Sequence, residues 1–275
     1  MKKKRGKKRR KKFLLFETKK RRVLTAIFAF LLLLLCIDIA RHYISAREQG
    51  VFASKYDYSR FNISEGFMTY EDDEYRGVIV IDVSEHQHKI DWEAVKKQGI
   101  NHAMLRIGYR GTTTGEIRED AYFRDNFKEA RSNGIKLGVY FFSQATTKEE
   151  AEEEARFVRD IVSPMELDLP VAFDMEQTSE EARIDILSDD EREEIASSFI
   201  RRIKDYGFKA MIYGNPHWFD SMVDLEKIED CYIWLAHYEE RPTFPYGFLM
   251  WQYSESGMLD GINGNVDMNI LMLRK

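Results

Sequence analysis

Short hydrophobic runs alternate with amphipathic stretches over most of this 275-residue chain. After residue 76, eight segments have the β-branched and aromatic content of buried strands, at 78–83, 102–109, 137–143, 170–176, 210–214, 232–237, 248–253 and 268–273. Four stretches between them repeat apolar residues at helical spacing, at 91–98, 120–132, 147–162 and 188–206. Thr147 with Glu150, and Ser188 with Glu191, predict a capping box at the start of the last two helices.

This order of elements predicts an α/β fold, a flattened, TIM-like β/α barrel formed by residues 77–275. A regular eightfold barrel takes roughly 250 residues. Because short loops separate the last strand candidates, we expect truncated helices in the last part of the barrel. A doubly wound open sheet is the alternative. No glycine-rich phosphate loop follows the first strand, which disfavours a nucleotide-binding version of that sheet.

A longer apolar run precedes the barrel at residues 23–40, with Asp38 as its one charged residue. A helix of that length extends roughly 27 Å, close to the thickness of a hydrocarbon core. We therefore predict a single transmembrane signal anchor at 23–40, after a basic cytoplasmic tail at 1–22 and before an extracellular stalk at 41–76. A cleaved signal peptide is the alternative, although Asp38 and Ala40 make a poor cleavage site.

Charge is divided unevenly along the chain, whose formal net charge is −5. Residues 1–22 contain 14 Lys and Arg and one Glu, a charge of +13, so the other residues, with 28 basic and 46 acidic side chains, carry −18. Basic residues beside a transmembrane helix stay in the cytoplasm and bind anionic lipids. This predicts a single-pass cell-membrane protein with an extracellular barrel. The acidic barrel excludes a nucleic-acid binder, because phosphate recognition needs a basic surface.

Acidic residues lie at the ends of three strand candidates. Asp82 is near the end of the first strand, Asp174 and Glu176 are at the end of the fourth, and Asp267 begins the last. Strand alternation puts Asp174 and Glu176 on one face, with Cα atoms roughly 7 Å apart, and points Met175 the other way. Two carboxyl groups that close keep different pKa values, so one stays protonated while the other ionises. Glycosidic bond cleavage needs such a pair, whereas carboxylates that only cap loops are the alternative.

Aromatic residues occupy several of the same strands. Sugars stack their apolar faces on aromatic rings, so an acidic cleft lined by such rings suits a glycan. The candidates for substrate contact are Tyr140, Phe142, Tyr213 and Trp234. Taken singly, each ring also fits an ordinary position in the core.

Histidines near the strand ends leave a metal-dependent amidohydrolase open as an alternative. Barrel enzymes of that class use an HxH motif after the first strand, histidines on middle strands and an Asp on the last strand. The corresponding residues here are His86, His88, His217, His237 and Asp267. No Lys or third acidic residue accompanies the acidic pair of the fourth strand, which suits acid catalysis better. We therefore expect no metal and no cofactor.

Five sequence blocks, in this order, resemble the family 25 glycoside hydrolases, which are the Chalaropsis-type lysozymes or N-acetylmuramidases. The blocks are GVIVIDVSEHQHKIDWEAVKKQGI, LRIGYRG, LGVYFFSQA, PVAFDMEQ and WQYSESGMLDGINGNVDMN. The resemblance covers about residues 77–275. The resemblance implies a flattened β/α barrel that hydrolyses the β-1,4 bond between N-acetylmuramic acid and N-acetylglucosamine in peptidoglycan, without a metal.

The resemblance also implies roles for individual residues. Glu176 matches the general acid of the family. Asp174 matches the partner carboxylate, which orients the N-acetyl group of the substrate or stabilises the developing cation. Asp82 and Asp267 match the two further acidic positions of the pocket. The motif leaves open whether the mechanism is retaining, inverting or substrate-assisted.

Two positions depart from the family pattern. Met175 stands where an aromatic residue is frequent, and His88 stands where a small residue or Gly is usual. Within the matching blocks, Gln87 and Gln252 are further candidates for substrate binding. A catalytically silent glycan-binding protein on the same fold is the last alternative, although the four acidic positions are intact.

Overall fold

The computed structural model describes residues 53–177, 182–221, 225, 228 and 231–275. The predicted cytoplasmic tail and transmembrane anchor lie outside the described residues, as does the stalk up to residue 52. In the part of the chain that the structure describes, no helix has both the length and the hydrophobicity that crossing a bilayer requires. Residues 54–275 form one compact unit.

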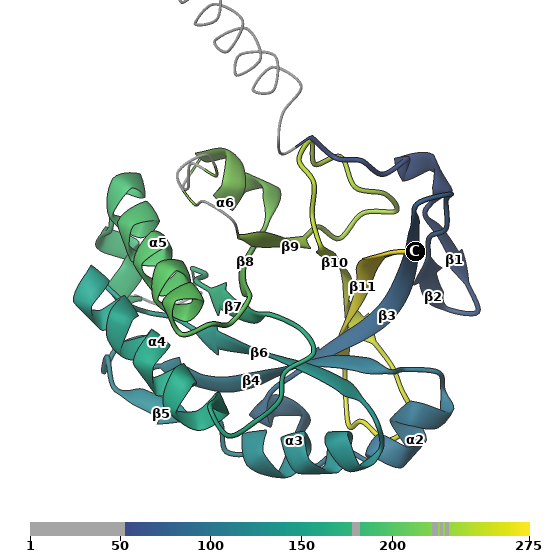
Figure 1. The fold of residues 1–275 in the computed structure, drawn as a ribbon, viewed down its shortest axis with the longest axis horizontal. Helices are drawn as coiled ribbons and strands as arrows, with labels where there is room; N and C mark the ends of the chain where they lie inside the picture. The colour runs from purple at the N-terminus through teal and green to yellow at the C-terminus, as the bar shows by residue number, and fades with distance from the viewer. Residues whose placement is uncertain (1–52, 178–181, 222–224, 226–227, 229–230) are drawn as a thin grey trace, which may run out of the picture. The chain divides into compact units, whose positions relative to one another are not determined.

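Eight strands of this unit close into a barrel (Figure 1). In the order of their pairing they are β3 (Tyr75–Val83), β11 (Val266–Arg274), β10 (Met250–Gly257), β9 (Tyr232–Ala236), β8 (Ala210–Gly214), β7 (Val171–Asp174), β6 (Lys136–Phe142) and β4 (His102–Arg110). Pairing of β3 with β4 closes the ring, and a short strand β5 (Ile117–Glu119) pairs with the end of β4. The eight predicted strands and the barrel are confirmed, and the open sheet is excluded.

The last strand runs against the direction of its neighbours. The other strands of the ring are mutually parallel, whereas β11 is antiparallel to both β10 and β3. Residues 258–265 alone join β10 to β11, and a parallel crossover needs roughly a dozen residues or more. As predicted, the connections at 237–249 and 258–265 contain no helix. The start of β11 therefore lies at the same end of the barrel as the ends of the parallel strands.

The four predicted helices are confirmed as α2 (Trp92–Lys97), α3 (Phe123–Ser132), α4 (Lys148–Val162) and α5 (Asp189–Asp205). A shorter helix, α6 (Pro216–Ser221), and single 3-10 turns at η1 (Tyr58–Arg60), η2 (Glu85–Gln87) and η3 (Arg183–Ile186) complete the helical elements of the described residues. Ser188 and Glu191 form the predicted capping box of α5. At α4 the box is one-sided, because the Glu150 carboxylate accepts from the backbone N of Thr146 at 2.7 Å and not from that of Thr147.

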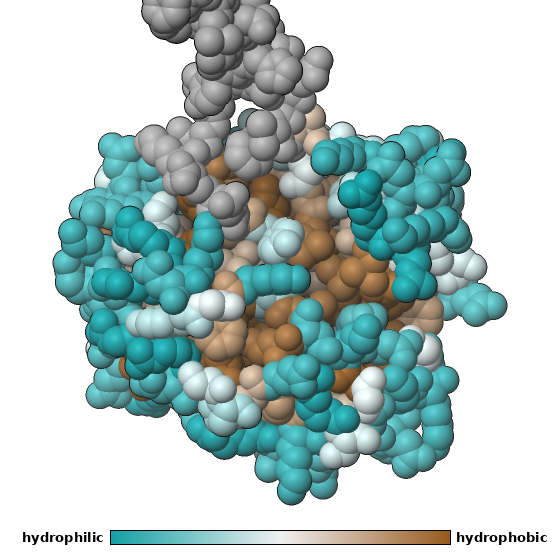
Figure 2. Space-filling model, viewed as in Figure 1, coloured by the Kyte–Doolittle hydropathy of each residue, from teal (hydrophilic) through white to brown (hydrophobic). Residues whose placement is uncertain are grey.

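Hydrophobic side chains fill two separate layers. A small cluster lies inside the barrel and includes Val80, Met104, Met211, Trp234 and Leu271. A larger cluster lies between the outer face of the barrel and the elements that cover it. On the face shown in Figure 2, hydrophobic residues gather toward the middle and hydrophilic residues surround them. Strand alternation thus sends one set of side chains into the barrel and the other set outward.

Residues 54–74, which the sequence pattern assigns to a stalk, belong to the barrel unit. This segment, the N-terminal strap, contains η1 and a hairpin of β1 (Asn62–Ser64) with β2 (Phe67–Thr69). Phe61, Met68 and Tyr70 of the strap are buried in the larger core. The Phe61 ring stands edge-on to Trp251 of β10, with ring centroids 5.1 Å apart. The predicted boundary between stalk and barrel at residue 77 is therefore wrong.

The strap covers strands that have no helix of their own. Tyr56 and Tyr58 donate hydrogen bonds to the backbone oxygens of Phe248 and Phe244, at 2.7 and 2.6 Å. Both acceptors belong to the helix-free connection at 237–249. Because β10 and β11 follow such connections, their apolar outer faces need another cover, and the strap provides it.

Candidate active site

The four acidic residues selected from the sequence meet at one end of the barrel. Asp82, near the end of β3, is the register partner of Asp267 at the start of β11. Asp174 is the last residue of β7, and Glu176 follows two residues later. Charge interactions link the two pairs, because Glu176 raises the pKa of Asp82 and Asp82 raises that of Asp174. The barrel therefore gathers all four carboxyl groups into one site.

Asp82 is buried and held by two amide side chains. Nδ2 of Asn269 and Nε2 of Gln252 both donate to its Oδ2, at 2.7 and 3.0 Å. Asn269 in turn accepts from Nε1 of Trp234 at 2.7 Å, and Gln252 accepts from the Tyr213 hydroxyl at 2.8 Å. Burial raises the pKa of Asp82 to about 6, against the donors, which favour the ionised form. Asp82 thus has a fixed orientation and titrates near neutral pH.

Asp267 faces Asp82 across the ladder between β3 and β11, and the two carboxyl groups interact. Burial and the charge of Asp82 raise the pKa of Asp267 to about 8. Two carboxyl groups in contact do not both ionise at low cost. With a pKa of about 8, Asp267 is mainly protonated at neutral pH.

Asp174 and Glu176 form a second pair, whose carboxyl groups affect each other's pKa. Asp174 is 6% exposed, whereas Glu176 is an exposed residue at the barrel mouth. Burial raises the pKa of Asp174, and the Glu176 carboxylate raises it further. Partial loss of water around the Glu176 carboxyl group raises its pKa as well. Burial and repulsion between carboxylates therefore both favour the protonated forms of this pair. Met175 between them points into the outer core as predicted.

Three aromatic rings selected from the sequence border these acids. Tyr140 and Tyr213 are only 9% and 7% exposed, and burial raises the pKa of both hydroxyl groups. Phe142 is the register partner of Asp174 and is half-buried at the end of β6. Phe142 is thus the most accessible of the three at the open end of the barrel.

Trp234 and Gln252, predicted to bind substrate, have supporting positions instead. Trp234 is 1% exposed, and its ring is edge-on to Tyr140 and Tyr213, with centroids 5.8 and 4.9 Å away. Gln252 is 2% exposed, and its amide group is hydrogen-bonded to Tyr213 and Asp82 within the barrel. Neither side chain offers a free surface to a ligand, because the closed ring of strands encloses both.

Gln87, also predicted to bind substrate, joins two loops. Its Oε1 accepts from the backbone N of Ser84 at 2.9 Å, which completes the capping box of η2. Its Nε2 donates to the backbone oxygen of Asn265 at 3.1 Å. Gln87 therefore ties the loop after β3 to the residue before β11, and so braces the strand ends that carry Asp82 and Asp267.

Three residues of the site escape prediction from the sequence. Asn269 orients Asp82, as described above. Tyr238, which is 49% exposed, donates from its hydroxyl to Oε1 of Gln252 at 2.8 Å. Arg106 of β4 contributes the positive charge that lowers the pKa of Asp174. Their location on or directly after a strand is the signal by which they could have been found.

The histidines considered as metal ligands lie on separate elements. His86 is in η2 and His88 directly follows it, whereas His217 is in α6 and His237 follows β9. Within the described ranges, no three or more His, Cys, Asp or Glu side chains are arranged to hold a metal ion. The metal alternative therefore has no candidate centre in that part of the chain.

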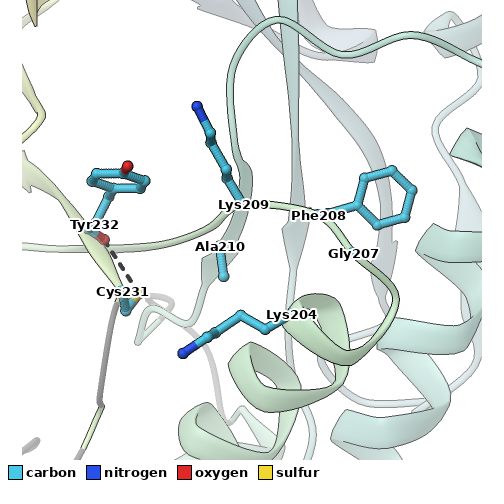
Figure 3. Close-up of a pocket in the computed structure, with 7 residues that line it drawn as sticks. All are labelled: Lys204, Gly207, Phe208, Lys209, Ala210, Cys231 and Tyr232. Carbon is cyan, nitrogen blue, oxygen red and sulfur yellow. Dashed lines mark hydrogen bonds between the residues drawn. The ribbon is translucent and has the colours of Figure 1, made fainter.

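A pocket of about 480 Å³ lies at the other end of the barrel strands (Figure 3). Its lining residues are Lys204, Gly207, Phe208, Lys209, Ala210, Cys231 and Tyr232. The Cys231 thiol donates to the backbone oxygen of Tyr232 at 3.3 Å, and burial raises its pKa. This lining has no carboxyl group, so the pocket offers no candidate for acid chemistry.

The sequence of this chain is similar to a known family and to several known proteins. The family model described as "Glycosyl hydrolases family 25" matches residues 81–262. A protein named YegX from Escherichia coli O157:H7 is 31% identical over 194 residues, which are 69% of this chain and 68% of YegX. The autolytic lysozyme of Clostridium acetobutylicum is 26% identical over 194 residues, 69% of this chain and 54% of that protein.

Solved structures share the barrel. The modular autolysin LytC from Streptococcus pneumoniae, in complex with a synthetic peptidoglycan ligand, superposes with a TM-score of 0.63 at 23% identity. The match covers 76% of this chain and 51% of LytC, so this chain spans about half the length of that relative. The bacterial lysozyme from Streptomyces coelicolor has a TM-score of 0.58 at 26% identity, over 71% of this chain and 92% of that one.

Proposed function

This chain belongs to glycosyl hydrolase family 25, and on that premise we propose that it is a membrane-anchored muramidase. It hydrolyses the β-1,4 bond between N-acetylmuramic acid and N-acetylglucosamine in peptidoglycan. The observation that carries this proposal is the Asp174–Glu176 pair, two interacting carboxyl groups with raised pKa values at the open end of the barrel. A carboxyl group whose pKa is raised holds a proton that it can donate, and departure of a sugar leaving group requires such a proton.

Glu176 is the general acid, because it is the exposed member of its pair and can reach the glycosidic oxygen of a bound glycan. Asp174 lies deeper, and it orients the N-acetyl group or stabilises positive charge on the sugar. Asp82 and Asp267 keep one negative charge between them beside this pair. A fixed negative charge stabilises the oxocarbenium-like transition state without moving during the reaction.

Peptidoglycan as the substrate draws support from the relatives. The Clostridium acetobutylicum protein is named an autolytic lysozyme, and LytC was solved with a synthetic peptidoglycan ligand. In this chain, the half-buried Phe142 and the exposed Tyr238 present aromatic rings beside the acids. Rings in that position can receive the apolar faces of sugar residues.

Membrane anchoring rests on the sequence pattern of residues 1–40. The apolar run at 23–40 spans the bilayer, and the basic tail at 1–22 stays in the cytoplasm, where it contacts anionic lipids. The barrel then lies outside the cell, next to the peptidoglycan. A tether of this kind raises the local concentration of the enzyme at its substrate.

The proposal is tested with the full-length protein in detergent and purified peptidoglycan. Wild type should release new reducing ends at N-acetylmuramic acid, and Glu176→Gln should lower the rate by roughly 10²- to 10⁴-fold, the usual contribution of a general acid. Glu240→Gln makes the same change at an exposed position of the 237–249 connection and should leave the rate unaltered. Mass spectrometry of the released fragments identifies the bond that is cleaved.

Three results would contradict the proposal. Activity that chelators abolish would favour the metal-dependent hydrolase. Binding of peptidoglycan without cleavage would favour a silent glycan-binding protein. Reducing ends at N-acetylglucosamine instead of N-acetylmuramic acid would assign the enzyme to a different bond of the same polymer.

A further inference from the structure

A buried ion pair lies outside the ring of four acids. Glu154 of α4 is fully buried, and Arg110 at the end of β4 is 3% exposed. Oε1 of Glu154 and Nε of Arg110 are 2.7 Å apart. The free energy needed to remove two charges from water offsets much of their Coulomb attraction. A buried ion pair is therefore weak evidence for a stabilising role. The bonds that this pair makes toward the active site give it another role.

The second oxygen of Glu154 binds the loop that follows β6. Its Oε2 accepts from the Ser143 hydroxyl at 2.7 Å. The backbone N of Ser143 donates to the carbonyl oxygen of Asp174 at 2.7 Å. Nε2 of the next residue, Gln144, donates to the carbonyl oxygen of Glu176 at 3.2 Å. Ser143 and Gln144, both fully buried, thus hydrogen-bond to the backbone of both members of the acid pair.

Glu176 depends on such support because the sheet does not hold it. The β7 strand ends at Asp174, whose register partners are Phe142 and Tyr213, and Glu176 lies beyond the last paired residue. The Gln144 side chain supplies the hydrogen bond that a strand neighbour would otherwise make. Position and orientation of Glu176 therefore depend on where the 143–144 loop is held.

A second arginine braces the same loop. Nη1 of Arg183 donates to the carbonyl oxygen of Gln144 at 3.1 Å, and Nη2 lies 2.7 Å from Oε1 of Glu150. Nη2 of Arg110 also donates to the backbone oxygen of Glu150, at 3.1 Å. The loop is thus anchored to helix α4 from both sides, with Glu154 as the only described carboxylate that reaches Ser143.

We propose that Glu154 is a positioning residue for the Asp174–Glu176 pair and acts through Ser143 and Gln144. The inference rests on the proposed function, since it concerns the acid pair of that reaction. Glu154 does not touch the substrate. It holds the loop whose two hydrogen bonds place the carbonyl oxygens of Asp174 and Glu176, and so sets the contact between the two carboxyl groups.

Kinetics of Glu154→Gln in the full-length protein test this role. The Gln side chain keeps the shape of Glu154 but loses the charge that orders Arg110 and Ser143. Because the acid pair is then misplaced relative to the substrate, kcat should fall by roughly 10- to 100-fold, with KM nearly unchanged. The limbs of the pH–rate profile should move as well. Ser143→Ala should lower kcat by a similar factor. The kcat of the double variant should be no lower than that of the less active single variant.

The matched control is Glu152→Gln on the same helix. Glu152 pairs with Arg202 of α5 at 3.0 Å, and among the described residues it makes no hydrogen bond or ion pair to the 143–144 loop. Rates are expressed per folded molecule from parallel unfolding measurements, so that a loss of stability alone does not count. Wild-type kcat and an unchanged pH profile in Glu154→Gln would overturn the proposal, whatever its melting temperature.

A measurement without substrate separates this proposal from the proposed function. Carbon-13 NMR of Asp and Glu side-chain carboxyl groups, with Asp174→Asn and Glu176→Gln as assignment variants, follows titration of the pair. Glu154→Gln should shift the midpoints of Asp174 and Glu176, and Glu152→Gln should not. Unshifted midpoints overturn the positioning role, whereas shifted midpoints in a protein that cleaves no glycan support that role and reject only the muramidase.

Discussion

Proton sharing is the main property of the individual acids in the barrel mouth. Asp82 and Asp267 titrate near pH 6 and pH 8, because both lose water and face each other across the β3–β11 ladder. In the unfolded chain an Asp titrates near pH 3.9. The folded barrel therefore binds these protons more tightly than the unfolded chain does, and pH becomes a determinant of its stability.

Asp267→Asn tests this link between protonation and stability. A group with a raised pKa contributes its full stability below roughly pH 4 and loses it as pH rises through the folded value, here about 8. The neutral amide does not ionise, so the variant should equal wild type near pH 4 and melt at an increasingly higher temperature than wild type as pH rises to 9. Thermal unfolding from pH 4 to 9 measures this difference.

Asp260→Asn, on the exposed connection between β10 and β11, provides the control for Asp267→Asn. This control should follow wild type at every pH. A constant difference between Asp267→Asn and wild type across the whole pH range would contradict the raised pKa of Asp267.

Among the elements, the N-terminal strap has the least expected role. It seals the outer faces of β10 and β11, which lack covering helices because their connections at 237–249 and 258–265 are too short or irregular to form them. The barrel therefore needs residues 54–74 as part of its core. A soluble domain that starts at Gly77 would expose the apolar surface which Phe61, Met68 and Tyr70 cover.

Phe61→Ala measures how much the strap contributes. Phe61 is 1% exposed, so truncation should lower the free energy of unfolding by about 3–5 kcal/mol, the range for a buried Phe. Ile63→Ala, in the same strap at 67% exposure, should change it by less than about 0.5 kcal/mol. Denaturant titration compares the two variants. Equal, small effects would mean that the strap is dispensable for the barrel.

At the scale of the whole molecule, charge is separated along the chain. The first 22 residues carry +13, and the rest carry −18 from 28 basic and 46 acidic side chains. A negatively charged barrel is not attracted to an anionic cell wall. The proposed anchor, and not electrostatic attraction, must therefore keep the enzyme near peptidoglycan.

Deletion of residues 1–40 tests the anchor. The shortened protein should move from the membrane fraction to the soluble fraction and should still cleave purified peptidoglycan, because the strap and barrel remain intact. Immunoblots of separated fractions, with a protease-accessibility assay on intact cells for the full chain, measure location and orientation. A full-length protein that salt alone extracts from membranes would contradict a spanning helix.

Local patterns in the sequence determine much of this protein. The eight strands, the four main helices and the acids at strand ends follow from the spacing of apolar residues and from capping residues, which depend on near neighbours. The acid pair at Asp174 and Glu176 follows from strand alternation alone. The family is also readable from the sequence, because its motifs are short contiguous blocks.

Tertiary structure decides what depends on distant residues. Asn269 orients Asp82 because β11 turns back against β3, a register that the sequence around either residue does not contain. Trp234 and Gln252 are almost fully buried by side chains from other strands of the ring. The strap joins the core because strands about 190 residues later in the chain have no covering helices. Burial and strand pairing are properties of the closed barrel, so only the folded chain reveals them.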